Sequence, residues 1–170
     1  TTATHTGAGS LNVNGATVQL ATGVALSGSG AINISAGTLS SAGTAEISHP
    51  VNFTAGAISG GGTLTLQGTT TFSGSGSKQT TGNVTVNLGD GIGAPGSVAA
   101  NWTGGTLDIR SSTVNIKADA AFTTNFDGTI NNGGGTLGTI NVEAGGSFTK
   151  SGTSGLTSIA ANGNLFAFNN

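Results

Sequence analysis

Three of the six acidic residues recur at nearly equal intervals, and carboxylates are the side chains of this chain that could do hydrolytic chemistry. They are Asp90, Asp108 and Asp127. Glycoside hydrolysis needs two carboxylates about 5–9.5 Å apart, and a lyase needs clustered acidic metal ligands beside a basic residue. Asp108 lies in an alternating, strand-like segment, whereas Asp90 and Asp127 lie beside Gly in turn-like segments. Because the three do not share a register, we expect no catalytic site and no enzymatic activity.

Metal and cofactor signals are equally weak. His5 and His49 are far apart, and neither has carboxylates at ligand spacing. The GGxGxDxUx nonapeptide of calcium-binding repeats is absent. Isolated GxG strings are expected in a chain with 32 Gly and do not indicate a phosphate site. The chain has no Cys, which excludes disulfides and thiolate ligands. We therefore expect no metal and no cofactor.

Charged side chains are scarce. Four basic and six acidic residues give a net charge of −2. The four basic residues are scattered, so the sequence argues against binding to nucleic acid, which needs clustered Lys and Arg. No apolar run approaches the ~20 residues of a membrane-spanning helix, so we expect no membrane insertion. Low charge together with many Thr and Asn residues favours a secreted or cell-surface protein, of bacterial origin.

Short apolar-polar-apolar triplets return with a period of about 21 residues, a length typical of repeat folds. Examples are Leu11-Asn12-Val13, Ile32-Asn33-Ile34 and Val51-Asn52-Phe53. Three ladders share this period: Leu11, Ile32, Phe53 and Phe72; Val18, Leu39 and Ile58; Leu26, Ile47 and Leu66. In the second half we align Leu88, Ile109 and Ile130, Ile116 with Leu137, and Phe122 with Val142. A fixed period in this range, built from short strands, is typical of a β-solenoid.

The fold expected is therefore all-β. We predict one single-stranded parallel β-helix over residues 1–170, with about eight coils of about 20 residues and three short strands per coil. The general preference of parallel crossovers favours a right-handed coil. Alternation predicts that the middle residue of each strand points outward. These outward positions are Asn12, Asn33, Asn52, Thr65, Asn87, Asp108, Asn115 and Asn141.

Two segments do not fit the coil. Residues 73–83 are wholly polar, and residues 89–97 are rich in Gly. We expect both to bulge from corners as loops, where the specificity of a repetitive scaffold usually lies. Tolerated insertions without a role are the alternative. The candidate surface or partner residues are Lys78, Gln79, Asp90, Pro95 and Trp102.

Aromatic and Thr residues raise two further binding hypotheses. Aromatic rings at the coil period favour a stacked core, and an exposed platform for sugars at Trp102 is the alternative. Ice binding would need Thr-x-Thr at one register on every coil. Thr63/Thr65 and Thr69/Thr71 have no partners one period away in the same pattern, so the sequence disfavours this function.

The repeat resembles known bacterial surface sequences. GGGTLTLQGTTTFSGSG at residues 60–76 is similar to passenger repeats of bacterial autotransporters. NWTGGTLDI (101–109), GTINNGGG (128–135), FTKSG (148–152) and FNN (168–170) resemble Gly-rich repeats of very large bacterial exoproteins. The resemblance covers most of residues 10–170, through motifs of low complexity. It implies a parallel β-helix in adhesion or in a surface stalk. These families share no catalytic residues, so none is transferred.

The sequence thus favours a non-catalytic extracellular β-helix that acts as a rigid stalk, fibre segment or adhesin. The partner would be a host or neighbouring-cell surface, or a glycan. A carbohydrate-binding or polysaccharide-processing β-helix is one alternative, and a self-assembling filament subunit is another. Both ends lack a helical or charged cap, so we expect either a piece of a longer repeat protein or a subunit that associates end to end.

Overall fold

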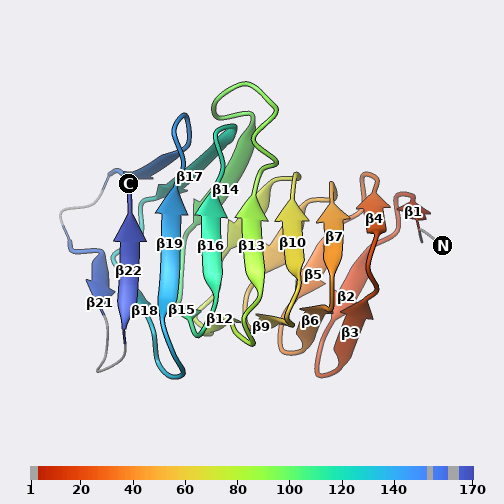
Figure 1. Cartoon of the computed structure of the whole chain (residues 1–170), viewed down its shortest axis with the longest axis horizontal. Coiled ribbons are helices and arrows are strands. Elements are labelled where there is room, and N and C mark those ends of the chain that lie inside the picture. The colour runs from red at the N-terminus through yellow and green to blue at the C-terminus, as the bar shows by residue number, and fades with distance from the viewer. Residues whose placement is uncertain (1–3, 153–154, 161–164) are drawn as a thin grey trace.

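The chain winds around one core, and its strands form three parallel β-sheets on the sides of the coil. The computed structural model describes residues 4–152, 155–160 and 165–170, with side chains from residue 7 onward. Within these ranges the structure has 22 strands and no helix. Consecutive strands belong to different sheets, and each strand pairs in parallel with the strand three places along the chain. This arrangement confirms the predicted parallel β-solenoid (Figure 1).

We name the sheets A, B and C. Sheet A contains β1 (Thr4–Thr6), β4 (Val24–Ser27), β7 (Thr44–Ile47), β10 (Thr63–Leu66), β13 (Thr85–Leu88), β16 (Thr113–Ile116), β19 (Gly138–Val142) and β22 (Phe166–Asn169). Sheet B contains β2 (Leu11–Val13), β5 (Ile32–Ile34), β8 (Val51–Phe53), β11 (Thr70–Phe72), β14 (Val98–Trp102), β17 (Ala120–Thr124) and β20 (Ser147–Lys150). Sheet C contains β3 (Thr17–Leu20), β6 (Thr38–Ser41), β9 (Gly56–Ser59), β12 (Lys78–Thr80), β15 (Leu107–Ile109), β18 (Thr129–Asn131) and β21 (Ser158–Ala160).

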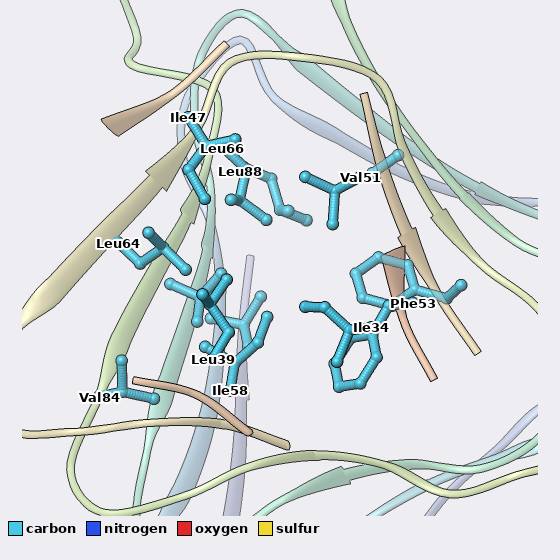
Figure 2. Close-up of a cluster of buried hydrophobic side chains, with 14 of the residues drawn as sticks. Ile34, Leu39, Ile47, Val51, Phe53, Ile58, Leu64, Leu66, Val84 and Leu88 are labelled. Carbon is cyan, nitrogen blue, oxygen red and sulfur yellow. The ribbon is translucent and has the colours of Figure 1, made fainter. Parts of the chain in front are cut away.

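The core lies between the three sheets, where alternate residues of each short strand point inward. Figure 2 shows Leu66 and Leu88 from sheet A facing Phe53 from sheet B, with Ile58 from sheet C beside them. All four side chains are buried. A row of rings continues along sheet B, and Phe122 and Phe148 stack at 4.9 Å between centroids. The prediction that the aromatic rings stack in the core is confirmed for these residues.

The register of the first coils follows the sequence pattern closely. Leu26, Ile47 and Leu66 stack in sheet A, as predicted. Val18, Leu39 and Ile58 stack in sheet C, also as predicted. In the ladder that begins at Leu11, only the step from Ile32 to Phe53 is wrong, and Phe53 pairs with Phe72 as predicted. Ile32 pairs with Val51, and Phe53 pairs with Ile34. Val51 and Phe53 are both buried, on either side of Asn52, so a constant period selected the second inward residue of this strand instead of the first.

The second half has longer coils than the sequence indicated. Leu88 pairs with Ile116 and not with Ile109, and Ile116 pairs with Val142 and not with Leu137. Phe122 pairs with Phe148, and Ile130 with Leu107. Paired residues are farther apart in the chain here because loops are inserted between the strands. Each sheet therefore has seven or eight strands, and the chain makes fewer complete coils than the eight predicted.

Of the two polar segments predicted to be loops, residues 89–97 form a loop, whereas residues 73–83 contain a strand. Residues 89–97 form the predicted loop between β13 and β14, and every residue from 91 to 97 is exposed. Residues 73–83 do not form one loop, because β12 (Lys78–Thr80) lies within them and pairs with β9 and β15. Its inward residues, Lys78 and Thr80, are both buried. Across the ranges described, no helix has the length and apolar character needed to span a membrane.

Candidate functional site

The three evenly spaced carboxylates lie on three different sides of the solenoid. Asp90 follows β13 of sheet A, Asp108 belongs to β15 of sheet C, and Asp127 follows β17 of sheet B. Asp127 accepts a hydrogen bond from Lys150 Nζ at 2.6 Å. The structure therefore does not bring these residues together. Among the described residues, no group of three or more His, Asp or Glu could hold a metal ion. His5 falls outside the residues whose side chains the structure describes.

Asp108 is not the solvent-exposed position that alternation predicted. The residue is 3% exposed, because the chain after β18 covers this part of sheet C. Arg110 Nε donates to Asp108 Oδ2 at 2.6 Å, and the backbone N–H of Gly133 donates to Oδ1 at 2.7 Å. The hydrogen bond to Asp108 raises the pKa of Arg110. A carboxylate engaged in this way holds a loop against the sheet, and we assign Asp108 that structural role.

Lys78 is a second residue that the structure moves from the surface to the interior. It is 2% exposed and lies at the corner between sheets B and C. Its ammonium donates to three backbone carbonyl oxygens, those of Gly76 at 2.8 Å, Gly104 at 2.7 Å and Gly74 at 3.3 Å. Burial lowers the pKa of Lys78 to about 8. Lys78 thus closes a corner, and its neighbour Gln79 remains partly exposed on the outer face of sheet C.

Trp102 does not form a sugar-binding platform. Its side chain is fully buried, and its ring packs edge-on against Phe126 with centroids 5.6 Å apart. The indole Nε1–H donates to the backbone oxygens of Gly104 at 3.1 Å and Gly105 at 3.0 Å. The carbonyl of Gly104 therefore accepts from both Trp102 and Lys78. The two residues form one buried corner, and neither is available to an external partner.

The loop at residues 89–97 contains the predicted surface residues Asp90 and Pro95, and both are at least partly exposed. It presents Ile92, which is 87% exposed, and the exposed Pro95. Asp90 is partly exposed at the base, where it accepts a hydrogen bond from Gln67 Nε2 at 3.1 Å. The loop projects beyond the strand ends of sheets A and B (Figure 1). An ordered loop with an apolar tip is suited to contact a partner.

Asp119, which the sequence did not single out, anchors this loop. Its carboxylate is buried and accepts hydrogen bonds from the N–H groups of Gly91 at 2.8 Å and Asp90 at 3.4 Å. Burial acts to raise the pKa of Asp119, but these N–H donors outweigh it and hold the pKa below its usual value. A buried Asp in the turn before β17 carries no recognisable sequence signal, because its partners belong to the preceding coil.

Rows of Asn side chains cover the outer faces of sheets A and B. In sheet A the amide of Asn115 donates to Asn87 at 2.8 Å, and Asn141 donates to Asn115 at 2.8 Å. In sheet B, Asn33 donates to Asn12 at 2.8 Å and Asn52 donates to Asn33 at 2.9 Å. Apart from the covered Asp108, the predicted outward residues thus lie on outer faces. Their side chains join successive coils by hydrogen bonds.

A polar recess lies farther along the outer face of sheet B. Asn101, Thr103, Thr123, Asn125 and Ser151 line it, and Thr123 Oγ1 donates to Asn101 Oδ1 at 2.9 Å. Its lining is rich in hydroxyl and amide groups and contains no charged side chain. Such groups can recognise the hydroxyls of a sugar.

Comparison of the chain with protein-family models, with curated protein sequences and with solved structures gives no match.

Proposed function

We propose that this chain is a non-catalytic extracellular β-solenoid that serves as a rigid stalk or fibre segment and carries an adhesive loop. The observation that carries the proposal is the continuity of the scaffold. One buried apolar core extends from Val13 to Ile140, and parallel pairing joins every described strand to its neighbours in its sheet. A shaft needs this kind of continuity, because each coil is supported by the coils that flank it.

The Asn rows add lateral connections that suit a stiff rod. Each amide that bridges two coils restrains their relative displacement, in addition to the backbone pairing between the same strands. The row in sheet A extends from Asn87, which donates to Thr65 Oγ1 at 3.3 Å, to Asn169, which donates to Asn141 at 2.7 Å. These bonds require the coils to stay in one register, so they favour a rigid shaft over a flexible tether.

The distribution of carboxylates supports a function without catalysis. Hydrolysis of a glycan would need two of them on one face at a separation that admits water or a covalent intermediate. Asp90, Asp108 and Asp127 lie on different sides of the solenoid. Asp108 accepts a hydrogen bond from Arg110, and Asp127 accepts one from Lys150.

The loop at residues 89–97 gives the shaft its contact with a host or neighbouring-cell surface.

Retention and turnover measured together test this proposal. The chain is immobilised on beads, and the beads are tested for retention on cell layers and on a panel of polysaccharides, while released reducing ends are assayed. We expect retention without release of sugar. An Ile92→Ser variant should lower retention, and Leu137→Ser, at another exposed apolar position, should not. Sugar release that Asp127→Asn abolishes would contradict a non-catalytic role.

Carbohydrate binding is a second candidate function, favoured by the polar recess of sheet B. Asn125 and Thr103 are exposed in its lining. Under this hypothesis Asn125→Ala lowers retention on one class of polysaccharide and leaves retention through Ile92 unchanged. Equal glycan binding by the original chain and by Asn125→Ala would exclude the recess as the binding site.

A further inference from the structure

Five Thr residues form a continuous row along sheet A, although they are unevenly spaced in the sequence. Strand pairing places Thr63 beside Thr44 and Thr85, and places Thr113 beside Thr85 and Thr139. The intervals along the chain are unequal, because loops of different length separate the strands of sheet A. A constant period of 21 residues therefore does not reveal the row. The Thr-x-Thr pattern that the sequence lacks at one register is also not repeated in the structure, because Thr65 pairs with Glu46 and Asn87.

The hydroxyls of this row have no partner within the described protein. The hydrogen bonds of the described residues include none from or to the side-chain oxygen of Thr44, Thr63, Thr85, Thr113 or Thr139. Each of these side chains is exposed or partly exposed. β-Branching restricts χ1 of Thr, so neighbouring hydroxyls in equivalent strand positions have few orientations available. The row is thus a set of similarly constrained hydroxyls that must bond to solvent or to a ligand.

A second row runs parallel to the first, two residues farther along each strand. It consists of Glu46, Thr65, Asn87, Asn115, Asn141 and Asn169. Its Asn amides are bonded to one another, as in the 2.8 Å bond from Asn141 to Asn115. These bonds fix the amides in place. The face therefore presents Thr hydroxyls without protein partners beside a row whose Asn amides are bonded to one another.

The Thr row has a regular spacing along sheet A. Neighbouring strands are about 4.8 Å apart, so successive Thr residues of the row are separated by about this distance. Figure 1 shows the strands of sheet A side by side in one direction, with β7, β10, β13, β16 and β19 as five successive rungs. A spacing of this order also separates oxygen atoms on the faces of an ice crystal. Water bound at one rung can therefore be in register with water bound at the next.

The side chains of the two rows are poorly suited to bind a charged ligand, a sugar or another protein. Only Glu46 carries a charge in the two rows over their described length. The ion pair of Lys117 with Glu143, at 2.6 Å, lies just past the ends of β16 and β19. Neither row contains an aromatic side chain, so the face lacks the rings that stack on sugars and the Trp, Tyr or Arg anchors of protein interfaces. Uncharged hydroxyls at fixed spacing are suited to ordered water.

We propose that the outer face of sheet A binds the surface of ice through the row of Thr44, Thr63, Thr85, Thr113 and Thr139. The hydroxyls hold a layer of water at lattice spacing, and this layer joins the growing crystal. A rigid stalk needs no such array, so the inference goes beyond the proposed function. An extracellular protein with this face would attach its bearer to ice or limit the growth of ice around it.

Ice adsorption of the purified, fluorescently labelled chain tests the proposal, together with thermal hysteresis and inhibition of ice recrystallisation. We expect the chain to be incorporated into a slowly growing ice sphere and to inhibit recrystallisation. Thr85→Tyr places a bulky ring in the middle of the row and should abolish both effects. Thr38→Tyr alters an equivalent first position in β6 of sheet C and should leave both effects unchanged. Far-ultraviolet circular dichroism verifies that each variant is folded.

A second variant distinguishes the effect of losing the Thr hydroxyls from the effect of changing the shape of the side chains. The triple substitution Thr63→Val, Thr85→Val and Thr113→Val keeps the β-branched shape, and it should reduce ice adsorption if the hydroxyls hold the water layer. Exclusion of the folded original chain from ice would overturn the proposal. So would retained adsorption by a folded Thr85→Tyr variant. Sedimentation that shows a dimer disrupted by Thr85→Tyr, without ice adsorption, would identify the face as a contact between two copies and would also overturn it.

Discussion

The side-chain amide of Asn115 donates to Oδ1 of Asn87 over 2.8 Å, although 28 positions separate the two residues in the chain. The same Asn115 accepts a bond from Asn141, 26 positions later. A row that stays continuous across unequal intervals shows that stacking register, and not a constant repeat length, organises the second half of the molecule. The loops between strands absorb the differences in length.

Asn115→Ala removes both of these bonds and leaves the strand backbone intact. A net contribution of about 0.5–1.5 kcal/mol per hydrogen bond predicts a loss of about 1–3 kcal/mol in the free energy of unfolding. Urea denaturation followed by circular dichroism measures it. Asn14→Ala, at an exposed position outside any described strand, is the matched control and should change stability very little. Equal stability of the two variants would show that the rows do not strengthen the stack.

Substitution by Ala should destabilise the chain at Gly62 but not at the adjacent Gly61. A Cβ at Gly62 would lie 2.1 Å from the backbone oxygen of Gly43 on the neighbouring coil, whereas a Cβ at Gly61 would meet nothing within 4 Å. Overpacking predicts that Gly62→Ala destabilises the chain by about 1–3 kcal/mol. Gly61→Ala should stay within about 0.5 kcal/mol of the original chain. Thermal unfolding compares them, and a fully tolerated Gly62→Ala would mean that the coils are farther apart than described.

The buried Lys78 should make stability depend on pH in alkaline solution. Its pKa is lowered to about 8 by burial, whereas an unfolded Lys titrates near pH 10.4. Between these values the unfolded chain binds more protons than the native chain, so the free energy of unfolding rises with pH. Below about pH 8 both states hold the proton and this contribution is constant.

Urea titrations at intervals from pH 7 to pH 10 measure this effect. The slope should disappear in Lys78→Met and persist in Lys117→Met, which removes a partly exposed Lys. Parallel profiles for the original chain and Lys78→Met would contradict the lowered pKa.

Asp119 should control the order of the loop at residues 89–97. Asp119→Ala removes the acceptor of the N–H groups of Gly91 and Asp90, so amide exchange in this loop should accelerate while exchange in β13 stays slow. The pKa of Asp119 is lowered in the native state. Its contribution is therefore complete above the unfolded pKa of about 3.9 and is lost as the pH falls through the native value. Unchanged exchange in the loop of Asp119→Ala would exclude this anchoring role.

The sequence predicted the fold class and most of the first coils, because short insertions are absent there. Leu26, Ile47 and Leu66 keep intervals close to one period, and the structure pairs them as predicted. The prediction failed after Leu88. The loop at residues 89–97 was itself predicted, but Leu88 was still aligned with Ile109 at a constant period of 21 residues. That alignment does not allow for the residues that loops add between paired strands, and the structure pairs Leu88 with Ile116.

The candidate site residues were harder to predict than the fold. A charged residue in a polar segment, such as Lys78, indicates solvent exposure unless its partners are known, and here the partners are backbone carbonyls on two coils. Trp102 satisfies its indole N–H in the same corner. Asp108 was predicted correctly to lie in a strand, but the chain that covers it comes from the following coil. Burial of this kind depends on contacts between coils, which composition does not encode.

Disulfide formation tests the register on which the Asn rows, the Thr row and the stiff shaft all depend. The chain has no Cys, so introduced pairs can be compared directly. Strands about 4.8 Å apart place equivalent Cα atoms within the range of about 4.4–6.8 Å that a disulfide spans. Asn87→Cys with Asn115→Cys follows the register of the structure, and Asn87→Cys with Asp108→Cys follows the constant period of the first coils. We predict that mild oxidation crosslinks the first pair and leaves the second pair reduced. Crosslinking of the second pair alone would contradict the stacking described here.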